Sequence, residues 1–225
     1  MTDTEVDAPV SLVDRVYAEL REAIVDGRRE AGTPLRLHEL TSEFGVSLIP
    51  VREAIRKLEV ERLVEMTPNK GARVAELTVE DLYDSYRVRA SLEAQALRLA
   101  FPKLSPEDIV EAREIVDSMV QAYDHDPRLS AELHRELHFL IYDRAESEWL
   151  GYLIRLLWAH TERYRRLGTP VPSGGDLGGE HLRMLDALAD GRIEAAVEAL
   201  QTDLEDTADR AMVRFTRQQS QDAAG

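Results

Sequence analysis

Hydrophobic residues recur every three or four positions between residues 11 and 60, a spacing that predicts helices. The first helix is expected over residues 11–26, where the repeat consists of Leu12, Val16, Leu20 and Ile24. A short helix over about residues 37–44 ends at Gly45. The next helix begins at Ser47, whose hydroxyl can cap its first turn. Two helices joined by so short a turn indicate a helix-turn-helix.

Two short extended segments follow this pair of helices. Residues 63–67 and 72–75 are separated by Pro-Asn-Lys-Gly, a sequence that favours a hairpin turn. A further turn is expected at residues 31–34, between the first two helices. A helix, a helix-turn-helix and a hairpin within residues 10–77 are the layout of a winged helix-turn-helix domain.

The pattern after residue 78 is helical throughout, with no credible strand. Helices are expected near residues 78–100, 105–124, 128–145, 147–167, 178–189 and 192–217. Proline and glycine separate them, and most connections are short, which favours an antiparallel bundle. We therefore expect a mainly α protein with a disordered acidic leader (1–9), a winged helix-turn-helix domain (10–77), an all-helical domain (78–217) and a disordered tail (218–225).

Composition narrows the chemistry of the chain. None of the 225 residues is cysteine, which excludes disulfide scaffolds, iron–sulfur clusters, thiolate zinc sites and cysteine nucleophiles. Any metal must then be held by nitrogen and oxygen ligands. No segment approaches the roughly 20 apolar residues of a spanning helix, and the first residues are acidic. We expect a cytoplasmic protein that does not interact with membranes.

The net charge of −15 argues against nucleic-acid binding only if it is evenly spread. It is not, because residues 10–77 are nearly neutral and most of the acid excess lies in residues 78–225. Residues 47–73 carry a small surplus of basic side chains. This segment is the one plausible surface for phosphate contact.

Segments from both parts of the chain resemble one family. The string GVSLIPVREAIRKLEVERLVEMTPNKGARV resembles the winged helix-turn-helix of GntR-family bacterial transcription regulators. The strings YRVRASLEAQALRLA, HRELHFLIYDRA and GEHLRMLDALADGRIEAAVEAL are similar to the all-helical FCD effector domain of the FadR-like branch. The resemblance implies a homodimeric, effector-responsive repressor or activator that binds a pseudo-palindromic double-stranded DNA operator. We expect a repressor.

In a winged helix-turn-helix, the second helix of the motif enters the major groove. The residues expected to contact DNA are Ser47, Leu48, Ile49, Arg52, Arg56, Lys70, Arg73 and His38. Arg52 is the candidate for a bidentate contact to guanine, and Lys70 and Arg73 for phosphate contacts of the wing. The alternative is that these charges are merely solvated, with Arg52 paired to Glu53 or Arg56 to Glu59.

Two residues depart from the family pattern. Similar regulators commonly have arginine and threonine where this chain has Leu48 and Ile49, and a basic or polar residue at the position of His38. Apolar side chains can touch thymine methyl groups but cannot hydrogen-bond to a base. We expect an operator that is recognised more through shape and methyl contacts.

Histidines at helical spacing suggest a metal site. His134 and His138 are four residues apart, so they project from one side of a helix, although such a pair is often a coincidence. Helices 178–189 and 192–217 form a hairpin that places His181 level with Asp203. The aligned FCD pattern implies the same four ligands, with His134 in place of an aspartate and Asp203 in place of a histidine. We expect a divalent ion, Zn²⁺, Ni²⁺, Mn²⁺ or Fe²⁺.

Arg89 lies on the apolar stripe of helix 78–100, together with Tyr86 and Glu93. An unpaired cation facing a bundle interior is costly. One resolution is an intrahelical ion pair with Glu93. The other, implied by the similar RxxLE segment of the family, is that Arg89, with Tyr86 nearby, binds the carboxylate of a small organic acid. His160 is a candidate to line the same pocket or to replace a ligand, or is simply packed.

These patterns predict a DNA-binding transcription regulator, and not an enzyme. A small organic-acid effector bound near a metal in the helical domain would control operator binding. Two alternatives stay open: a helical-bundle metallohydrolase that uses the three histidines and the aspartate, and a regulator whose metal is purely structural.

Overall fold

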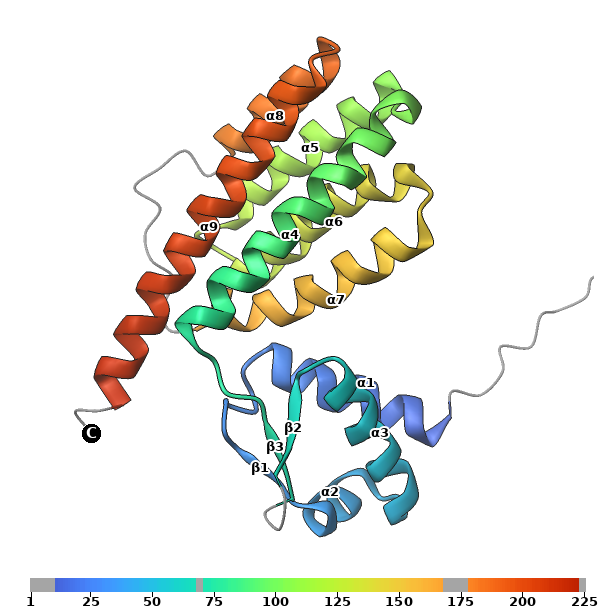
Figure 1. Cartoon of the computed structure of the whole chain (residues 1–225), viewed down its shortest axis with the longest axis vertical. Helices are drawn as coiled ribbons and strands as arrows, with labels where there is room; N and C mark the ends of the chain where they lie inside the picture. The colour runs from blue at the N-terminus through green and yellow to red at the C-terminus, as the bar shows by residue number, and fades with distance from the viewer. Residues whose placement is uncertain (1–10, 68–70, 168–177, 223–225) are drawn as a thin grey trace, which may run out of the picture. The chain divides into compact units, whose positions relative to one another are not determined.

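The computed structural model describes residues 11–67, 71–167 and 178–222 (Figure 1). The chain divides into two compact units between Thr78 and Val79. The helical content and the order of the elements confirm a mainly α protein with an N-terminal winged helix-turn-helix followed by a helical bundle. Among the described residues, no helix combines the length and the apolar character that a membrane span requires.

The N-terminal unit contains three helices and a small sheet. Its elements are α1 (Leu12–Val25), β1 (Pro34–Leu35), α2 (Leu37–Phe44), α3 (Leu48–Val60), β2 (Val64–Thr67) and β3 (Gly71–Val74). Helix α2 ends at Gly45, whose φ of 63° is left-handed and easy only for a residue without Cβ. Apolar side chains of all three helices and the sheet form one core, which includes Leu20, Leu40, Ile55 and Val74.

Two details of this unit differ from expectation. Strand β1 occupies the end of the turn predicted at residues 31–34 and pairs with β3, so the sheet order is β1-β3-β2. Two residues are too few to show alternation in a sequence, and the partner strand supplies the hydrogen bonds. Ser47 does precede α3, but its hydroxyl makes no capping hydrogen bond and stays exposed. The predicted hairpin turn, including Lys70, falls on residues 68–70, outside the described part.

The C-terminal unit is an antiparallel bundle. Its helices are α4 (Val79–Ala100), α5 (Pro106–Ala122), α6 (Pro127–Tyr142), α7 (Glu148–Arg165), α8 (Gly179–Ala189) and α9 (Ile193–Asp222), with 3₁₀ turns η1 (Phe101–Lys103) and η2 (Asp143–Ala145). Helix α4 packs against α7 and α9, α5 against α6 and α8, and α8 against α9 (Figure 1). Facing helices therefore bring side chains from α4, α6, α7, α8 and α9 into one interior.

Helix ends in the bundle follow local chemistry. Ser105 and Asp108 form a capping box at the start of α5, and the Asp126 carboxylate accepts from the Leu129 amide at the start of α6. Helix α9 continues to Asp222, past residue 217, where the helical domain was expected to end. No proline or glycine interrupts residues 218–222, so nothing local stops the helix. Residues 1–9 and 223–225 lie outside the described part.

Candidate metal centre and nucleic-acid interface

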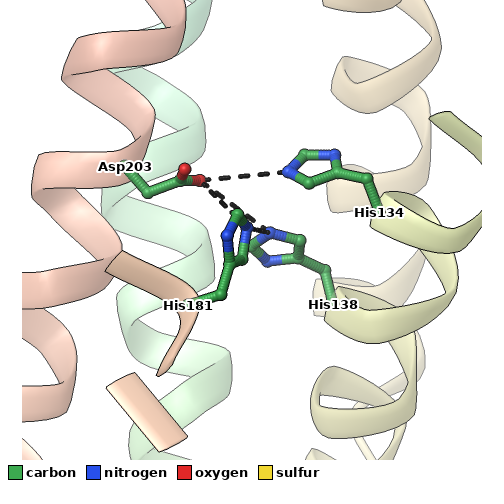
Figure 2. A group of neighbouring side chains, drawn as sticks. All are labelled: His134, His138, His181 and Asp203. Atoms are coloured by element: carbon green, nitrogen blue, oxygen red, sulfur yellow. Dashed lines mark hydrogen bonds and ion pairs between the residues drawn. The ribbon is translucent and has the colours of Figure 1, made fainter. Parts of the chain in front are cut away.

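Four side chains from three helices converge in the bundle, as Figure 2 shows. His134 and His138 come from α6, His181 from α8 and Asp203 from α9, and one ligand atom of each lies within 4.8 Å of the others. The Nε2 atoms of His138 and His181 are 3.2 Å apart. Oδ2 of Asp203 is 3.7 Å from Nε2 of His181, 3.9 Å from that of His138 and 4.0 Å from that of His134.

These spacings suit four ligands of a single ion. Ligand atoms bound at about 2.1 Å lie about 3–4.2 Å from one another, depending on whether they are adjacent or opposite. The donor set of three imidazole nitrogens and one carboxylate oxygen suits Zn²⁺, Ni²⁺, Mn²⁺ and Fe²⁺. The chemistry of the residues present therefore fits a divalent metal.

Burial keeps two of the histidines, His134 and His138, in the form that a metal needs. His138 is fully buried, and His181 and Asp203 are 4% and 6% exposed. Burial lowers the pKa of His138 well below 6.5, and the neighbouring His181, Arg89 and Arg165 lower it further. The pKa of His134 is lowered in the same direction, first by burial and then by the adjacent histidines. Neutral imidazoles present lone pairs to the centre of the cluster.

A chain of hydrogen bonds fixes the tautomer of His138. The Tyr142 hydroxyl donates to Oε2 of Glu93 over 2.8 Å, so it accepts from Nδ1–H of His138 over 2.9 Å. Burial raises the pKa of Tyr142 well above 10, which keeps that hydroxyl protonated. The proton on Nδ1 leaves Nε2 of His138 as a lone pair directed at the other three side chains.

Arg89 continues this chain on the same side of the cluster. Its Nε donates to Oε1 of Glu93 over 2.7 Å, and its Nη1 donates to the Thr161 hydroxyl over 2.8 Å. Its guanidinium lies over the Trp158 ring, 4.3 Å from the ring centroid. Burial acts to lower the pKa of Arg89, but the charge and hydrogen bond of Glu93, together with Tyr86 and Tyr142, raise it overall. The intrahelical ion pair between Arg89 and Glu93, one of the two predicted roles of Arg89, is therefore present.

The other two predicted effector residues have different surroundings. Tyr86 is 4% exposed, and its hydroxyl has no hydrogen-bond partner among the described residues. Nε2 of His160 lies 2.6 Å from Oδ2 of Asp81, which also accepts from the Tyr164 hydroxyl. His160 is therefore not one of the four converging side chains, and it is packed against α4.

A cavity of about 70 Å³ adjoins the cluster. Three cluster residues line it, together with Met119, Tyr123, Ser130, Arg165, Thr207, Arg210, Ala211 and Arg214. None of these three arginines was predicted from the sequence as a site residue. A signal was present for two of them, because Arg210 and Arg214 follow Asp203 by seven and eleven residues, which places all three on one face of α9.

The predicted DNA-reading residues lie on the N-terminal unit and are mostly exposed. Ile49 is 72% and Leu48 38% exposed at the start of α3. Arg52 is exposed, with no ion-pair partner among the described residues, so the proposed pair with Glu53 does not form. Arg56 pairs with Glu53 over 2.9 Å, and not with Glu59.

His38 and Arg73 complete the described members of that set. His38 is exposed on α2, while Arg73 is half-buried on β3, 4.0 Å from Glu76. Both therefore belong to the same unit as α3. Arg36, exposed just before α2 and paired with Glu39, is a further cation that the sequence analysis did not single out.

Comparison with known families covers both units. Residues 12–74 match the bacterial regulatory proteins of the gntR family, and residues 84–206 match the FCD domain. The chain belongs to the GntR family. Its FCD domain makes it a member of the FCD-containing group of these regulators, as the two resembling segments implied.

Curated relatives of this GntR-family chain are transcription regulators. The uncharacterized HTH-type transcriptional regulator BphR of Paraburkholderia xenovorans is 29% identical over 209 residues, which are 87% of this chain and 83% of BphR. The HTH-type transcriptional repressor GlaR of Escherichia coli is 30% identical over 155 residues, which cover 66% of this chain and 70% of GlaR. The protein is accordingly a transcription regulator.

Solved structures share its fold. Escherichia coli McbR/YncC aligns with a TM-score of 0.75 at 23% identity, covering 92% of this chain and 99% of that one. A GntR regulator from Rhodococcus sp. RHA1 aligns with a TM-score of 0.72 at 26% identity, covering 89% and 97%. The two-unit architecture of this GntR-family regulator is thus shared with both.

Proposed function

We propose that this regulator is a homodimeric repressor whose operator binding is controlled by a small organic acid bound beside a divalent metal. The observation that carries the proposal is the cluster of three imidazoles and one carboxylate, three of them buried and His134 half-buried, next to a cavity. A divalent ion held there would offer an oxygen of the ligand a coordination position. Ligand binding would then favour one arrangement of the bundle over another.

Metal content tests this proposal directly. Purified full-length protein should contain about one divalent ion per chain, and His138→Ala should lower that ratio sharply, because removal of one ligand leaves three. His125→Ala is the matched control, since His125 is exposed and outside the cluster. Elemental analysis with native mass spectrometry measures both quantities. A wild-type protein without stoichiometric metal would refute the assignment of the four ligands.

The alternatives make different predictions. Of the residues that line the cavity, Asp203 is the one carboxylate, so no second carboxylate is placed there to serve as a general base. This lining and the regulator relatives do not favour a hydrolase. If the metal were purely structural, chelation would unfold the bundle, while no acid would change operator affinity.

For operator recognition we propose that α3 reads the major groove through Arg52, with Leu48 and Ile49 against thymine methyl groups. Exposure of both apolar side chains supports this, because exposed leucine and isoleucine at a helix start otherwise serve no packing purpose. Arg52→Ala should weaken operator binding by about 1–3 kcal/mol in fluorescence anisotropy at fixed salt. Leu48→Arg should raise affinity for unrelated DNA, and a loss of affinity for all DNA would contradict the methyl-contact assignment.

We propose that a second copy of the chain covers part of α7. Trp149 is 77% and Tyr152 52% exposed, with their ring centroids 6.2 Å apart, and such large apolar rings rarely stay in water. A two-fold operator requires two reading heads, which a homodimer supplies. Analytical ultracentrifugation should show a dimer for the wild-type protein and a weaker one for Trp149→Arg. Arg155→Ala, nearby on the same helix, is the control. If Trp149→Arg dimerised as strongly as the wild-type protein, this surface would not be the dimer interface.

A further inference from the structure

We propose that the ligand of the metal-adjacent cavity is a compact dianion. One anionic group would lie at the histidine–aspartate cluster, and a second would be held by Arg165, Arg210 and Arg214. This inference rests on the proposed function, and it names the chemical class that the cavity selects.

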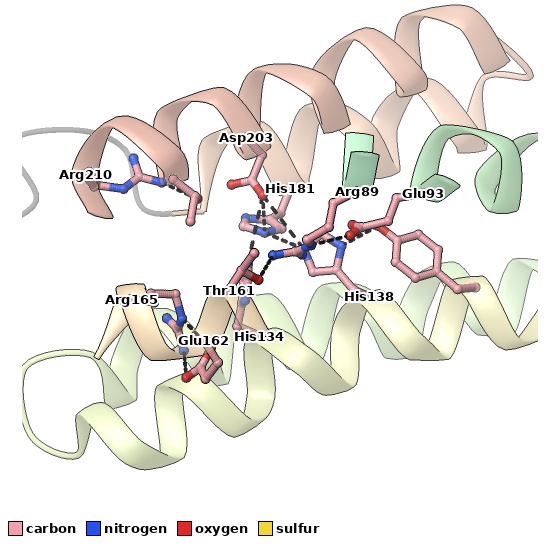
Figure 3. Close-up of polar contacts among 12 residues, drawn as sticks. Arg89, Glu93, His134, His138, Thr161, Glu162, Arg165, His181, Asp203 and Arg210 are labelled. Atoms are coloured by element: carbon pink, nitrogen blue, oxygen red, sulfur yellow. Dashed lines mark hydrogen bonds and ion pairs between the residues drawn. The ribbon is translucent and has the colours of Figure 1, made fainter. Parts of the chain in front are cut away.

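The three arginines approach the cavity from facing helices. Arg165 comes from the end of α7, and Arg210 and Arg214 come from α9. Figure 3 shows Arg165 and Arg210 on one side of the cluster, with Glu93 on the other. Helical side chains lean toward the helix N-terminus, so both α9 arginines lean back along the helix toward Asp203.

The described residues offer this arginine group fewer carboxylates than guanidinium groups. Glu162 accepts two hydrogen bonds from Arg165, over 2.9 and 3.0 Å, but it also accepts one from Arg166 over 2.8 Å. Among the residues that the structure describes, no carboxylate pairs with Arg210 or Arg214. Within the described part of the chain, Arg165 therefore shares its carboxylate with Arg166, and Arg210 and Arg214 have none.

The α9 arginines are instead held by neutral groups. Arg210 donates to the Thr207 hydroxyl over 2.9 Å, and Arg214 donates to the backbone carbonyl of Arg165. Nε of Arg214 is buried and has no hydrogen-bond partner within the described chain. Burial lowers the pKa of Arg214, and the charges of Arg165 and Arg210 add to this effect. Arg165 and Arg214 are half-buried and Arg210 is exposed, and a group of three cations with one shared carboxylate among the described residues favours an anionic ligand.

The size of the cavity limits the ligand. A water molecule needs roughly 10–15 Å³ by the same kind of measure, so 70 Å³ holds about five waters. A volume of this size favours an acid of about four to six carbon atoms over a nucleotide or a long-chain acid. A monoanion bound at the metal would leave the arginines unmatched, which is why the second anionic group is required.

A matched pair of acids tests the second group. Malate and 2-hydroxybutyrate share the α-hydroxy acid and the chain length, and they differ in a terminal carboxylate against a methyl group. Isothermal titration of the Zn²⁺-loaded full-length protein should show malate binding at least about tenfold more tightly, because charge-assisted hydrogen bonds to arginine are strong. A second pair, 3-phosphoglycerate and glycerate, differs in a terminal phosphate against a hydroxyl group, so tighter binding of 3-phosphoglycerate would show that the second anionic group can be a phosphate.

Variants assign the preference to the arginines. Arg210→Gln and Arg214→Gln should remove most of the preference for malate and leave 2-hydroxybutyrate binding unchanged. Arg217→Gln is the matched control, since Arg217 is exposed on the same helix and does not line the cavity. Circular dichroism and zinc content verify that each variant is folded, and the wild-type comparison of the two acids does not depend on the variants.

The outcomes separate the two proposals. Equal affinity for malate and 2-hydroxybutyrate, or equal weakening of both by the glutamine variants, would overturn the dianion and leave the metal-dependent regulator intact. Failure of the wild-type protein to bind zinc or any of these acids would overturn both. A preference that disappears in Arg210→Gln and Arg214→Gln, but not in Arg217→Gln, would establish the dianion.

Discussion

Arginines lie on both sides of the histidine–aspartate cluster, and the two sides differ in how their charge is balanced. Arg89 is 4% exposed, paired with Glu93, hydrogen-bonded to Thr161 and stacked on Trp158. Arg210 and Arg214 have no carboxylate partner within the described residues. A cation on an apolar stripe is therefore not by itself a ligand-binding group. The partners that the fold supplies decide whether it is structural or available.

The largest expected effect concerns Arg89, whose charge is balanced by Glu93. Arg89→Met should lower the free energy of unfolding by about 3–5 kcal/mol, because it leaves the Glu93 carboxylate buried and unpaired. Chemical denaturation of the metal-free protein measures this. Arg98→Met is the control, since the Arg98–Glu194 pair is exposed and such pairs contribute about 0–1 kcal/mol. A small change in the free energy of unfolding for Arg89→Met would show that the Arg89–Glu93 pair does not stabilise the fold.

Low pH should lower the stability of the metal-free fold through two histidines of the cluster. His134 and His138 have pKa values well below 6.5 when folded, while unfolded histidine titrates near 6.5, so the unfolded chain binds more protons as the pH falls below that value. The metal-free protein should then lose up to about 1.4 kcal/mol per pH unit for each histidine as the pH falls from 6.5 toward 5. Urea titrations at several pH values measure the slope.

The control for this pH dependence is His125→Ala, which alters an exposed histidine and should leave the slope unchanged. His134→Gln should reduce the slope. If stability were constant between pH 6.5 and 5, His134 and His138 would not be neutral in the folded bundle.

A smaller effect is expected from the hydrogen bond that orients His138. Tyr142→Phe removes the acceptor for Nδ1–H of His138, and loss of such a partner typically lowers metal affinity by about 10–100-fold. Competition with a chelator measures the affinity for Zn²⁺. Tyr152→Phe, at an exposed tyrosine, is the control. Unchanged zinc affinity in Tyr142→Phe would show that the hydrogen bond from His138 to Tyr142 does not contribute to metal binding.

The smallest effect is expected for Arg214, which has no carboxylate partner within the described residues. Arg214→Met should leave the unfolding free energy of the ligand-free protein unchanged or raise it by up to about 1 kcal/mol, since it removes a cation held near other cations without a carboxylate. Thermal and chemical denaturation next to Arg89→Met make the contrast direct. A loss of several kcal/mol in Arg214→Met would show that Arg214 has a structural role and would remove the distinction between the two sides.

Most helices and the four side chains of the cluster can be predicted from the sequence. Spacing of apolar residues, with glycine and proline at the breaks, defined the helices of both units within a few residues, because helix formation depends on local periodicity. The four side chains of the cluster were also found from spacing, since a helix turn relates His134 to His138 and a tight hairpin relates His181 to Asp203. Strand β1 was missed because its two residues owe their pairing to a strand far along the chain.

The sequence by itself thus determined the order of elements, the family and the four side chains of the cluster, all of which depend on neighbours within a turn or a hairpin. Only the tertiary structure decided that Arg89 is matched by Glu93 and Thr161, that His160 contacts Asp81, and that Arg165 joins Arg210 and Arg214 at one cavity. The physical reason is that charge balance depends on every group within a few ångströms. Those groups come from helices whose positions in the sequence are far apart.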